Sequence, residues 1–185
     1  MAIFYTSDLH LGHENILPSR PQFNSIEMHD EFLIERWNSV VKNNDEIFIL
    51  GDLSYRAKYH VSHYLNRMRG KKKLIVGNHD SYWMKNVEDL SVYFESVDYF
   101  KTIKWEHKLL TMMHFPMLEW TESRRIDDYS YLIHGHTHRE KNATYEYIKD
   151  NLPHALNASV DVNNFRPVVF EELKKNNAVF YEREI

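Results

Sequence analysis

The first half of the chain alternates short apolar runs with longer amphipathic stretches. Three runs have the length of strands and end at glycine or polar residues: 2–6, 46–50 and 74–76. Residues 24–41 place apolar side chains on one helical face, with Asn24 or Ser25 as the N-cap. Residues 58–69 show a second helical pattern, which Gly70 ends. This half therefore predicts the element order β-α-β-α-β.

The second half is richer in strands. The predicted strands are 99–105 and 108–114, joined as a hairpin, then 131–133 and a terminal strand at 178–181. Apolar and polar residues alternate over 156–162, which predicts a half-exposed strand, and 170–176 predicts a short helix. The basic run 69–73 predicts a solvated turn. Together the elements predict one α/β domain over residues 1–185, with two sheets.

Composition narrows the class of protein. The chain has 185 residues, about the size of one domain, and no cysteine, which excludes disulfides, iron–sulfur clusters and thiol nucleophiles. The formal charge of −4 argues against a dedicated nucleic-acid binder. The N-terminus has no signal-peptide pattern and no window approaches the ~20 apolar residues of a membrane span. These features predict a cytoplasmic protein without a membrane partner.

Candidate chemistry lies at the points where the apolar runs stop. Twelve histidines are many for this length, and histidine is the commonest metal ligand. The polar segments are Asp8-Leu9-His10, Gly51-Asp52, Gly77-Asn78-His79-Asp80, Met113-His114-Phe115 and Gly135-His136-Thr137-His138. Sites assemble at the carboxyl ends of strands, and carboxylate, amide and imidazole groups suit borderline divalent metals. The ordered set therefore predicts a metal site.

Spacing within the segments supports this interpretation. Residues i and i+2 in extended backbone point to one side, so Asp8 and His10 could hold one ion, and His136 and His138 also share a side. The glycines at 51, 77 and 135 would let the backbone turn sharply, so that the next side chain faces the site.

In this order, the motifs resemble those of the calcineurin-like metallophosphoesterase superfamily, and residues 8–16 resemble its small bacterial and phage branch. The tail 161–168 also recurs in that branch. The resemblance implies a two-sheet sandwich flanked by helices, with four layers in the order αββα, and a dinuclear metal centre. It implies a first metal held by Asp8, His10 and His138, and a second held by Asn78, His114 and His136. Asp52 would bridge both.

The resemblance also implies that His79 protonates the leaving oxygen. In the larger phosphatases a second aspartate after Gly-Asp orients this histidine, whereas Tyr55 stands at that position here. Asp80 is a candidate replacement for it, and we include Asp80 with Asp52 and His79 among the candidate catalytic residues. Arg56 keeps a position that can hold a phosphate. His13 lies beside the first motif and is a second candidate for contact with substrate.

The predicted function is a metal-dependent phosphoesterase that hydrolyses a small phosphate ester or phosphodiester through attack by a metal-bridging hydroxide. Two alternatives remain: a nuclease-type phosphodiesterase, and a non-catalytic interaction scaffold. The scaffold reading is disfavoured because such scaffolds lose ligands that this chain keeps. Two divalent ions are the predicted cofactors, with manganese favoured over iron, zinc or nickel. The partner is a small phosphorylated substrate, and the oligomeric state stays open.

Overall fold

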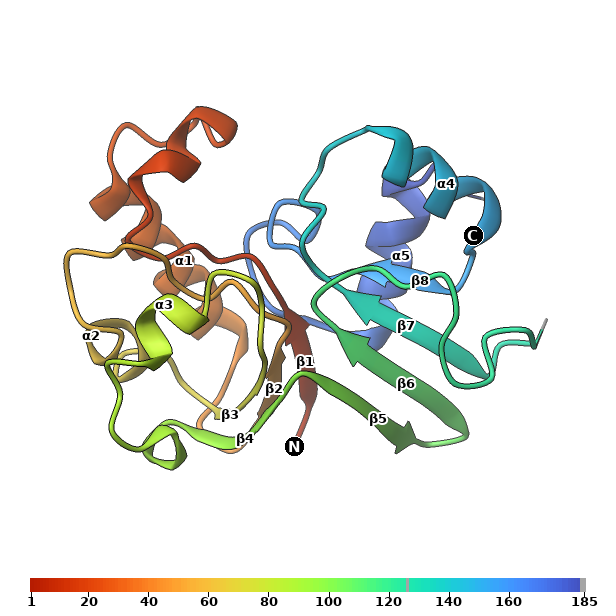
Figure 1. Cartoon of the computed structure of the whole chain (residues 1–185), viewed down its shortest axis with the longest axis horizontal. Coiled ribbons are helices and arrows are strands. Elements are labelled where there is room, and N and C mark those ends of the chain that lie inside the picture. The colour runs from red at the N-terminus through yellow and green to blue at the C-terminus, as the bar shows by residue number, and fades with distance from the viewer. Residues whose placement is uncertain (126, 184–185) are drawn as a thin grey trace.

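The computed structural model describes residues 1–125 and 127–183, and their strands form two sheets (Figure 1). The first sheet has the strand order β4-β3-β2-β1-β9 and the second has the order β5-β6-β7-β8. The first contains β1 (Ile3–Thr6), β2 (Glu46–Ile49), β3 (Lys71–Ile75), β4 (Phe94–Asp98) and β9 (Val168–Val169). The second contains β5 (Phe100–Trp105), β6 (Lys108–Met113), β7 (Ser130–His134) and β8 (Ala155–Asn157).

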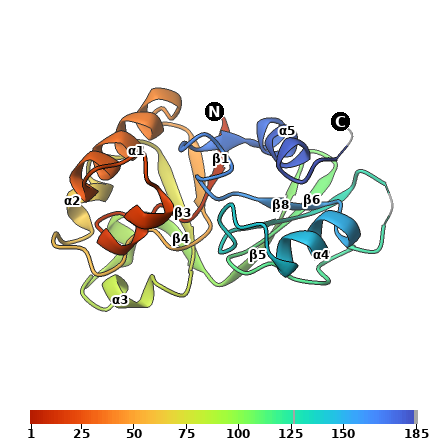
Figure 2. The same ribbon diagram turned by 90° about the horizontal axis from the view of Figure 1, so that it is seen from above.

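Helices flank the two sheets on both sides (Figure 2). On the first sheet's side lie η1 (Glu14–Ser19), α1 (Ile26–Val40), α2 (Ser62–Leu65), α3 (Ser81–Met84) and η2 (Leu90–Val92). On the other side lies α4 (Ala143–Asn151), while α5 (Phe170–Phe180) contacts β1, β8 and β9. No helix among the described residues is long and apolar enough to cross a lipid bilayer.

Three apolar cores separate the layers, and the strand pleat distributes side chains among them. Along β1, Phe4 belongs to the core beneath α1, whereas Tyr5 belongs to the core between the sheets. Along β7, Ile133 also lies between the sheets, and Leu132 packs with Ile148 of α4. Successive side chains on a strand point to opposite faces, so consecutive apolar residues of one strand pack into two different cores. This confirms the predicted α/β class with two sheets flanked by helices.

Several predicted elements of the first half are confirmed in part. Helix α1 matches its prediction, and Ser25 rather than Asn24 caps it, because the Ser25 hydroxyl accepts a hydrogen bond from the Met28 amide at 3.2 Å. The helix predicted over 58–69 is wrong in length. Only a single helical turn forms, at α2. Beyond it the Arg67 amide donates to the Tyr64 carbonyl, an i→i−3 hydrogen bond typical of a turn.

The basic run 69–73 was predicted as a solvated turn, and this prediction is also wrong. Residues from Lys71 onward form the first part of β3, paired with β2. The Lys73 ammonium donates to a Glu46 carboxylate oxygen at 2.6 Å. A salt bridge between neighbouring strands therefore stabilises a charged side chain inside the sheet, where the basic run had predicted a turn.

The C-terminal predictions need two corrections. The half-exposed strand over 156–162 is only the short, fully buried β8, because its side chains pack against α4 on one face of the second sheet and against α5 on the other. The terminal strand at 178–181 is instead the last part of α5. Asn177 lies inside this helix, fully buried, and its amide bonds to the Leu173 and Asn157 carbonyls. The predicted hairpin of β5 and β6 is confirmed.

Parallel strand pairing determines where the loops meet. β1 pairs in parallel with β2, and β2 with β3, so their carboxyl ends lie at one edge of the first sheet. In the second sheet β6 and β7 are also parallel. A bridge between Ser7 and Ser159 and a hydrogen bond from the Gly135 amide to the His114 carbonyl join the loops beyond these strands. All five polar segments are therefore gathered in one region.

Candidate metal centre

Three groups of imidazoles and carboxylates converge at this edge of the sheets. Within each group, one ligand atom per side chain lies within 4.8 Å of the others. Among the described residues the groups are Asp8-His10-His138, His10-Asp52-His79 and Asp52-His114-His136. The structure thus brings together side chains from five separate segments of the sequence.

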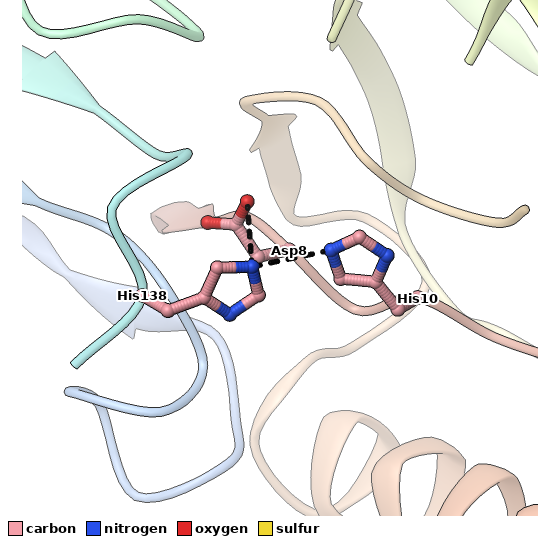
Figure 3. A group of neighbouring side chains, drawn as sticks. All are labelled: Asp8, His10 and His138. Carbon is pink, nitrogen blue, oxygen red and sulfur yellow. Dashed lines mark hydrogen bonds and ion pairs between the residues drawn. The ribbon is translucent and has the colours of Figure 1, made fainter. Parts of the chain in front are cut away.

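The first group joins the loop after β1 to the loop after β7 (Figure 3). The Nε2 atoms of His10 and His138 are 3.3 Å apart, and His138 Nε2 lies 3.9 Å from Asp8 Oδ1. Asp8 and His10 are almost wholly buried. Two ring nitrogens and a carboxylate oxygen that face one another at these separations fit a divalent cation.

The third group, Asp52-His114-His136, lies at the ends of β2, β6 and β7, and Asn78 lies beside it at the end of β3. His114 Nε2 is 3.0 Å from Asn78 Oδ1 and 3.4 Å from Asp52 Oδ2, and the His136 ring packs edge-on to the His114 ring. His114 Nδ1 donates to the Leu50 carbonyl at 2.8 Å. This bond fixes the ring so that Nε2 points at the oxygens, as in ligating histidines.

Asp52 connects the first group to the third. Its Oδ2 atom lies 3.7 Å from His10 Nε2, 3.4 Å from His114 Nε2 and 3.9 Å from His79 Nε2. Burial alone would raise the pKa of Asp52, but His114 lowers it to about 2. Burial likewise opposes the charged form of His114, yet Asp52 and Asp8 raise its pKa to about 9. The Asp52 carboxylate and the His114 imidazole therefore favour each other's charged forms, and a cation at this position would be stabilised in the same way.

The backbone at this site differs from the extended geometry that the sequence suggested. Five of the seven candidate ligands have positive φ angles: Asp8 (56°), His10 (52°), Asp52 (54°), His136 (69°) and His138 (48°). The side chains converge, but left-handed residues aim them rather than the i, i+2 alternation of a strand. Such conformations cost about 1–3 kcal/mol each and cluster at functional sites.

Glycines at this site allow segments of backbone to approach each other closely, as well as allowing sharp turns. Of the three glycines expected to turn the backbone, Gly51 has a φ of +84°, whereas Gly77 and Gly135 have no positive φ. A Cβ at Gly135 would lie 2.7 Å from Ser7 Oγ and 2.8 Å from Asp8 Oδ2. The loop after β7 can therefore lie against Asp8 only without a side chain at position 135.

We expect Gly135→Ala to displace Asp8. The added methyl group should lower the free energy of unfolding by about 1–3 kcal/mol and weaken Mn(II) binding in calorimetric titrations. The matched control is Gly70→Ala, which crowds Ile47 and Val41 at 2.9 Å near the start of β3. It should destabilise the fold and leave Mn(II) affinity unchanged. Equal Mn(II) affinity in both variants would contradict this reading of Gly135.

His79 faces the same site from the loop after β3. Its amide donates to Asp52 Oδ1 at 2.9 Å, and its side chain is 31% exposed, so it is accessible from solvent. The Tyr55 ring packs against the imidazole with centroids 4.3 Å apart. The side chain that stands where the larger phosphatases have an aspartate therefore contacts His79 through its aromatic ring, tilted by 53°.

Asp80 does not take the place of that aspartate. It is fully buried, and its carboxylate accepts four hydrogen bonds of 2.8–2.9 Å, from the amides of Gly77, Asp52 and Leu53 and from Trp83 Nε1. None of these donors belongs to the His79 ring. These contacts do not support a role for Asp80 in orienting His79: its carboxylate fixes the Gly51-Asp52 turn to the 77–83 segment.

This role predicts a large loss of stability in Asp80→Ala. Each buried N–H left without an acceptor costs about 1–3 kcal/mol, so the free energy of unfolding in urea should fall by at least about 3 kcal/mol. Asp89→Ala, at an exposed cap that holds the Ser91 amide, should cost far less. An Asp80→Ala protein with wild-type stability but no turnover would restore the catalytic assignment.

The two candidate substrate residues lie beside one cavity. His13 and Arg56 line a cavity of about 300 Å³ together with Lys58 and Tyr59. His13 Nδ1 is 3.3 Å from His10 Nδ1, so the cavity begins next to the first group. Arg56 has a φ of +47° and its guanidinium carbon lies 5.1 Å from the centroid of the Tyr55 ring.

The sequence did not indicate the side chains that hold the candidate ligand His138 in place. Asp161 Oδ2 accepts a hydrogen bond from His138 Nδ1 at 2.8 Å, and the fully buried Arg20 forms an ion pair with the same carboxylate. Burial opposes the charge of Asp161, but His138 and Arg20 hold its pKa well below the usual range. The signal was the tail that begins at Asp161. For Arg20, between two prolines, the sequence offered none.

Comparison with known proteins agrees with this geometry. The calcineurin-like phosphoesterase superfamily domain matches residues 1–156. The Gene 66 protein of Mycobacterium phage L5 is 32% identical, covering 73% of this chain and 76% of that protein. An uncharacterized protein of Methanocaldococcus jannaschii is 29% identical over 94% of this chain and 89% of its own length. The solved structure of a protein of unknown function from Aquifex aeolicus superposes with a TM-score of 0.70 at 25% identity, covering 94% and 98% of the two chains.

The fold and the clustered ligands define a metal-dependent phosphoesterase, a hydrolase that acts on ester bonds. The chain belongs to the calcineurin-like phosphoesterase superfamily.

Proposed function

We propose that the chain hydrolyses small phosphate esters or phosphodiesters with two divalent ions, manganese being the favoured metal. Asp8, His10 and His138 would hold one ion, and Asn78, His114 and His136 the other. Asp52 would touch both. The observation that carries this proposal is the position of Asp52 Oδ2, within 3.7 Å of a ring nitrogen from each group. Two bound ions would activate water and neutralise phosphate oxygens.

The protein's own residues supply the rest of the chemistry. His79 is the proposed general acid, because its ring is partly exposed and its Nε2 lies 3.9 Å from the proposed bridging carboxylate. A leaving oxygen at the site would therefore be within its reach. Asp52 also accepts a hydrogen bond from the His79 amide, so one carboxylate would position both the ions and the acid.

The cavity at His13 and Arg56 supports a small substrate. Its volume of about 300 Å³ is at the lower end of the range for small-molecule pockets. The Arg56 guanidinium can pair with a phosphate oxygen, and His13 borders both the cavity and His10. A nucleic-acid duplex fits less well, because the formal charge of the chain is −4.

A substrate panel tests the proposal. Bis-p-nitrophenyl phosphate, p-nitrophenyl phosphate and cyclic nucleotides should be assayed with Mn(II), Fe(II), Zn(II) and Ni(II). We expect metal-dependent turnover of at least one ester, abolished by chelation and restored by Mn(II). Wild-type protein that binds metal but hydrolyses none of the esters, with or without added metal, would contradict the proposal.

A further inference from the structure

Arg20 is a wholly buried cation behind the candidate metal centre. Its Nε and Nη2 atoms donate to the two oxygens of Asp161 at 2.9 and 2.8 Å. The same guanidinium donates to the Asp8 carbonyl at 2.7 Å and to the Leu9 carbonyl at 3.0 Å. One planar group therefore ties the loop after β1 to the segment after β8, two parts of the chain more than a hundred residues apart.

Asp161 passes this constraint to His138. Its Oδ2 accepts from His138 Nδ1 at 2.8 Å and from the Ser159 hydroxyl at 3.1 Å. A carboxylate only accepts, so Nδ1 carries the hydrogen and the lone pair stays on Nε2. That Nε2 atom faces His10 and Asp8 across the first ligand group. Asp161 thus fixes both the ring orientation and the tautomer that a metal ligand needs.

The other side of Arg20 continues the network. Its Nη1 lies 2.7 Å from His29 Nε2, and because a guanidinium cannot accept, His29 Nε2 must accept. His29 Nδ1 therefore donates to Asp30, at 2.8 Å, and Asp30 in turn accepts from the Gly12 amide at 2.9 Å. Both ends of the loop that carries Asp8 and His10 are thereby attached to the same buried arginine.

We propose that Arg20 and Asp161 are positioning residues that build the ion site of Asp8, His10 and His138 in advance of metal binding. Neither is among the residues that would hold the ions. Arg20 places the backbone of Asp8 and the carboxylate of Asp161, and Asp161 presents His138 Nε2. This inference rests on the dinuclear centre proposed above and assigns the two residues to one of its ion sites. The other site, of Asn78, His114 and His136, uses the Leu50 carbonyl for the same purpose and should be independent of them.

The test is Mn(II) binding, measured by calorimetry and electron paramagnetic resonance on the full chain without substrate. His138→Ala and His114→Ala first show which binding step belongs to which site. Asp161→Asn should then reproduce the pattern of His138→Ala, with the affinity of that step reduced about 10–100-fold. The isosteric amide can donate to Nδ1 and so favours the wrong tautomer. Arg20→Lys keeps the charge but not the fork, and should weaken the same step.

The matched control is Asp45→Asn. Asp45 is also a buried carboxylate that holds backbone amides, those of Ala2 and Lys42 at 2.9 Å, but it lies before β2, at the far end of the sheet. It should lower thermal stability and leave both Mn(II) steps unchanged, which separates positioning from a general loss of structure.

Each outcome decides the matter. If Asp161→Asn binds Mn(II) as the wild type does, or weakens both steps equally, the inference is overturned and the dinuclear centre stands. If Asp161→Asn does not fold, Arg20→Lys decides by the same criterion. Wild-type protein that binds no Mn(II) would overturn the proposed function itself, and the inference with it.

Discussion

Asp52→Asn should damage the protein's chemistry more than a change at any other single ligand. The amide keeps the shape of the side chain but removes the negative charge that would lie between the two proposed divalent ions. The repulsion of two such ions at ~4 Å is appreciable even at a high effective dielectric. We expect the affinity for at least one ion to fall by more than ~10–100-fold, the loss typical of changing a residue that only hydrogen-bonds to a metal ligand. Turnover should fall at least about 10³-fold, or about 4 kcal/mol of transition-state stabilisation.

Metal titration of Asp52→Asn and His10→Ala side by side checks this result. Asp45→Asn is again the matched control, because Asp45 is a buried carboxylate at the opposite end of β2 from Asp52. This variant should retain both ions. If His10→Ala loses both ions while Asp52→Asn retains two, then Asp52 is not shared between the sites.

His79→Ala should remain folded and keep its metals while losing most turnover. A general acid contributes about 10²–10⁴-fold, and the loss should reach this range for alkyl phosphate esters, which have poor leaving groups. For p-nitrophenyl esters the loss should be smaller, because p-nitrophenolate hardly needs a proton. Initial rates on the two kinds of ester with Mn(II) give the comparison.

Equal losses on both kinds of ester would show that His79 stabilises charge on the phosphate instead. Tyr55→Phe provides a control, because it removes the hydroxyl group and keeps the ring that packs against His79. If ring packing orients the imidazole, Tyr55→Phe should retain most of the turnover on alkyl esters.

The sequence predicted the convergence of the site because strand ends are easy to recognise. Apolar runs ending at Asp8, Asp52 and Asn78 belong to neighbouring parallel strands, and parallel pairing brings their carboxyl ends to one edge. Residue type picked out the polar segments, and the resemblance to the superfamily's motifs implied the individual ligands. Their conformation did not, because left-handed backbone at Asp8 and His138 is imposed by tertiary contacts that no local pattern encodes.

Long-range polar contacts account for what the sequence could not predict. Arg20 and Asp161 are separated by 141 positions, and nothing in either local pattern indicates an ion pair. Asp80 looked like a catalytic carboxylate because it follows His79, yet its oxygens are saturated by Gly77, Asp52 and Leu53. Helix α4 was missed because its sequence is mostly polar, and Tyr145 and Ile148 are its buried residues.

X-ray diffraction at the manganese absorption edge, on crystals of the wild-type protein loaded with Mn(II), shows directly whether Asp52 lies between two bound ions. We expect two anomalous peaks on either side of Asp52, one among Asp8, His10 and His138 and the other among Asn78, His114 and His136. A single peak, or two peaks that do not both contact the Asp52 carboxylate, would contradict it.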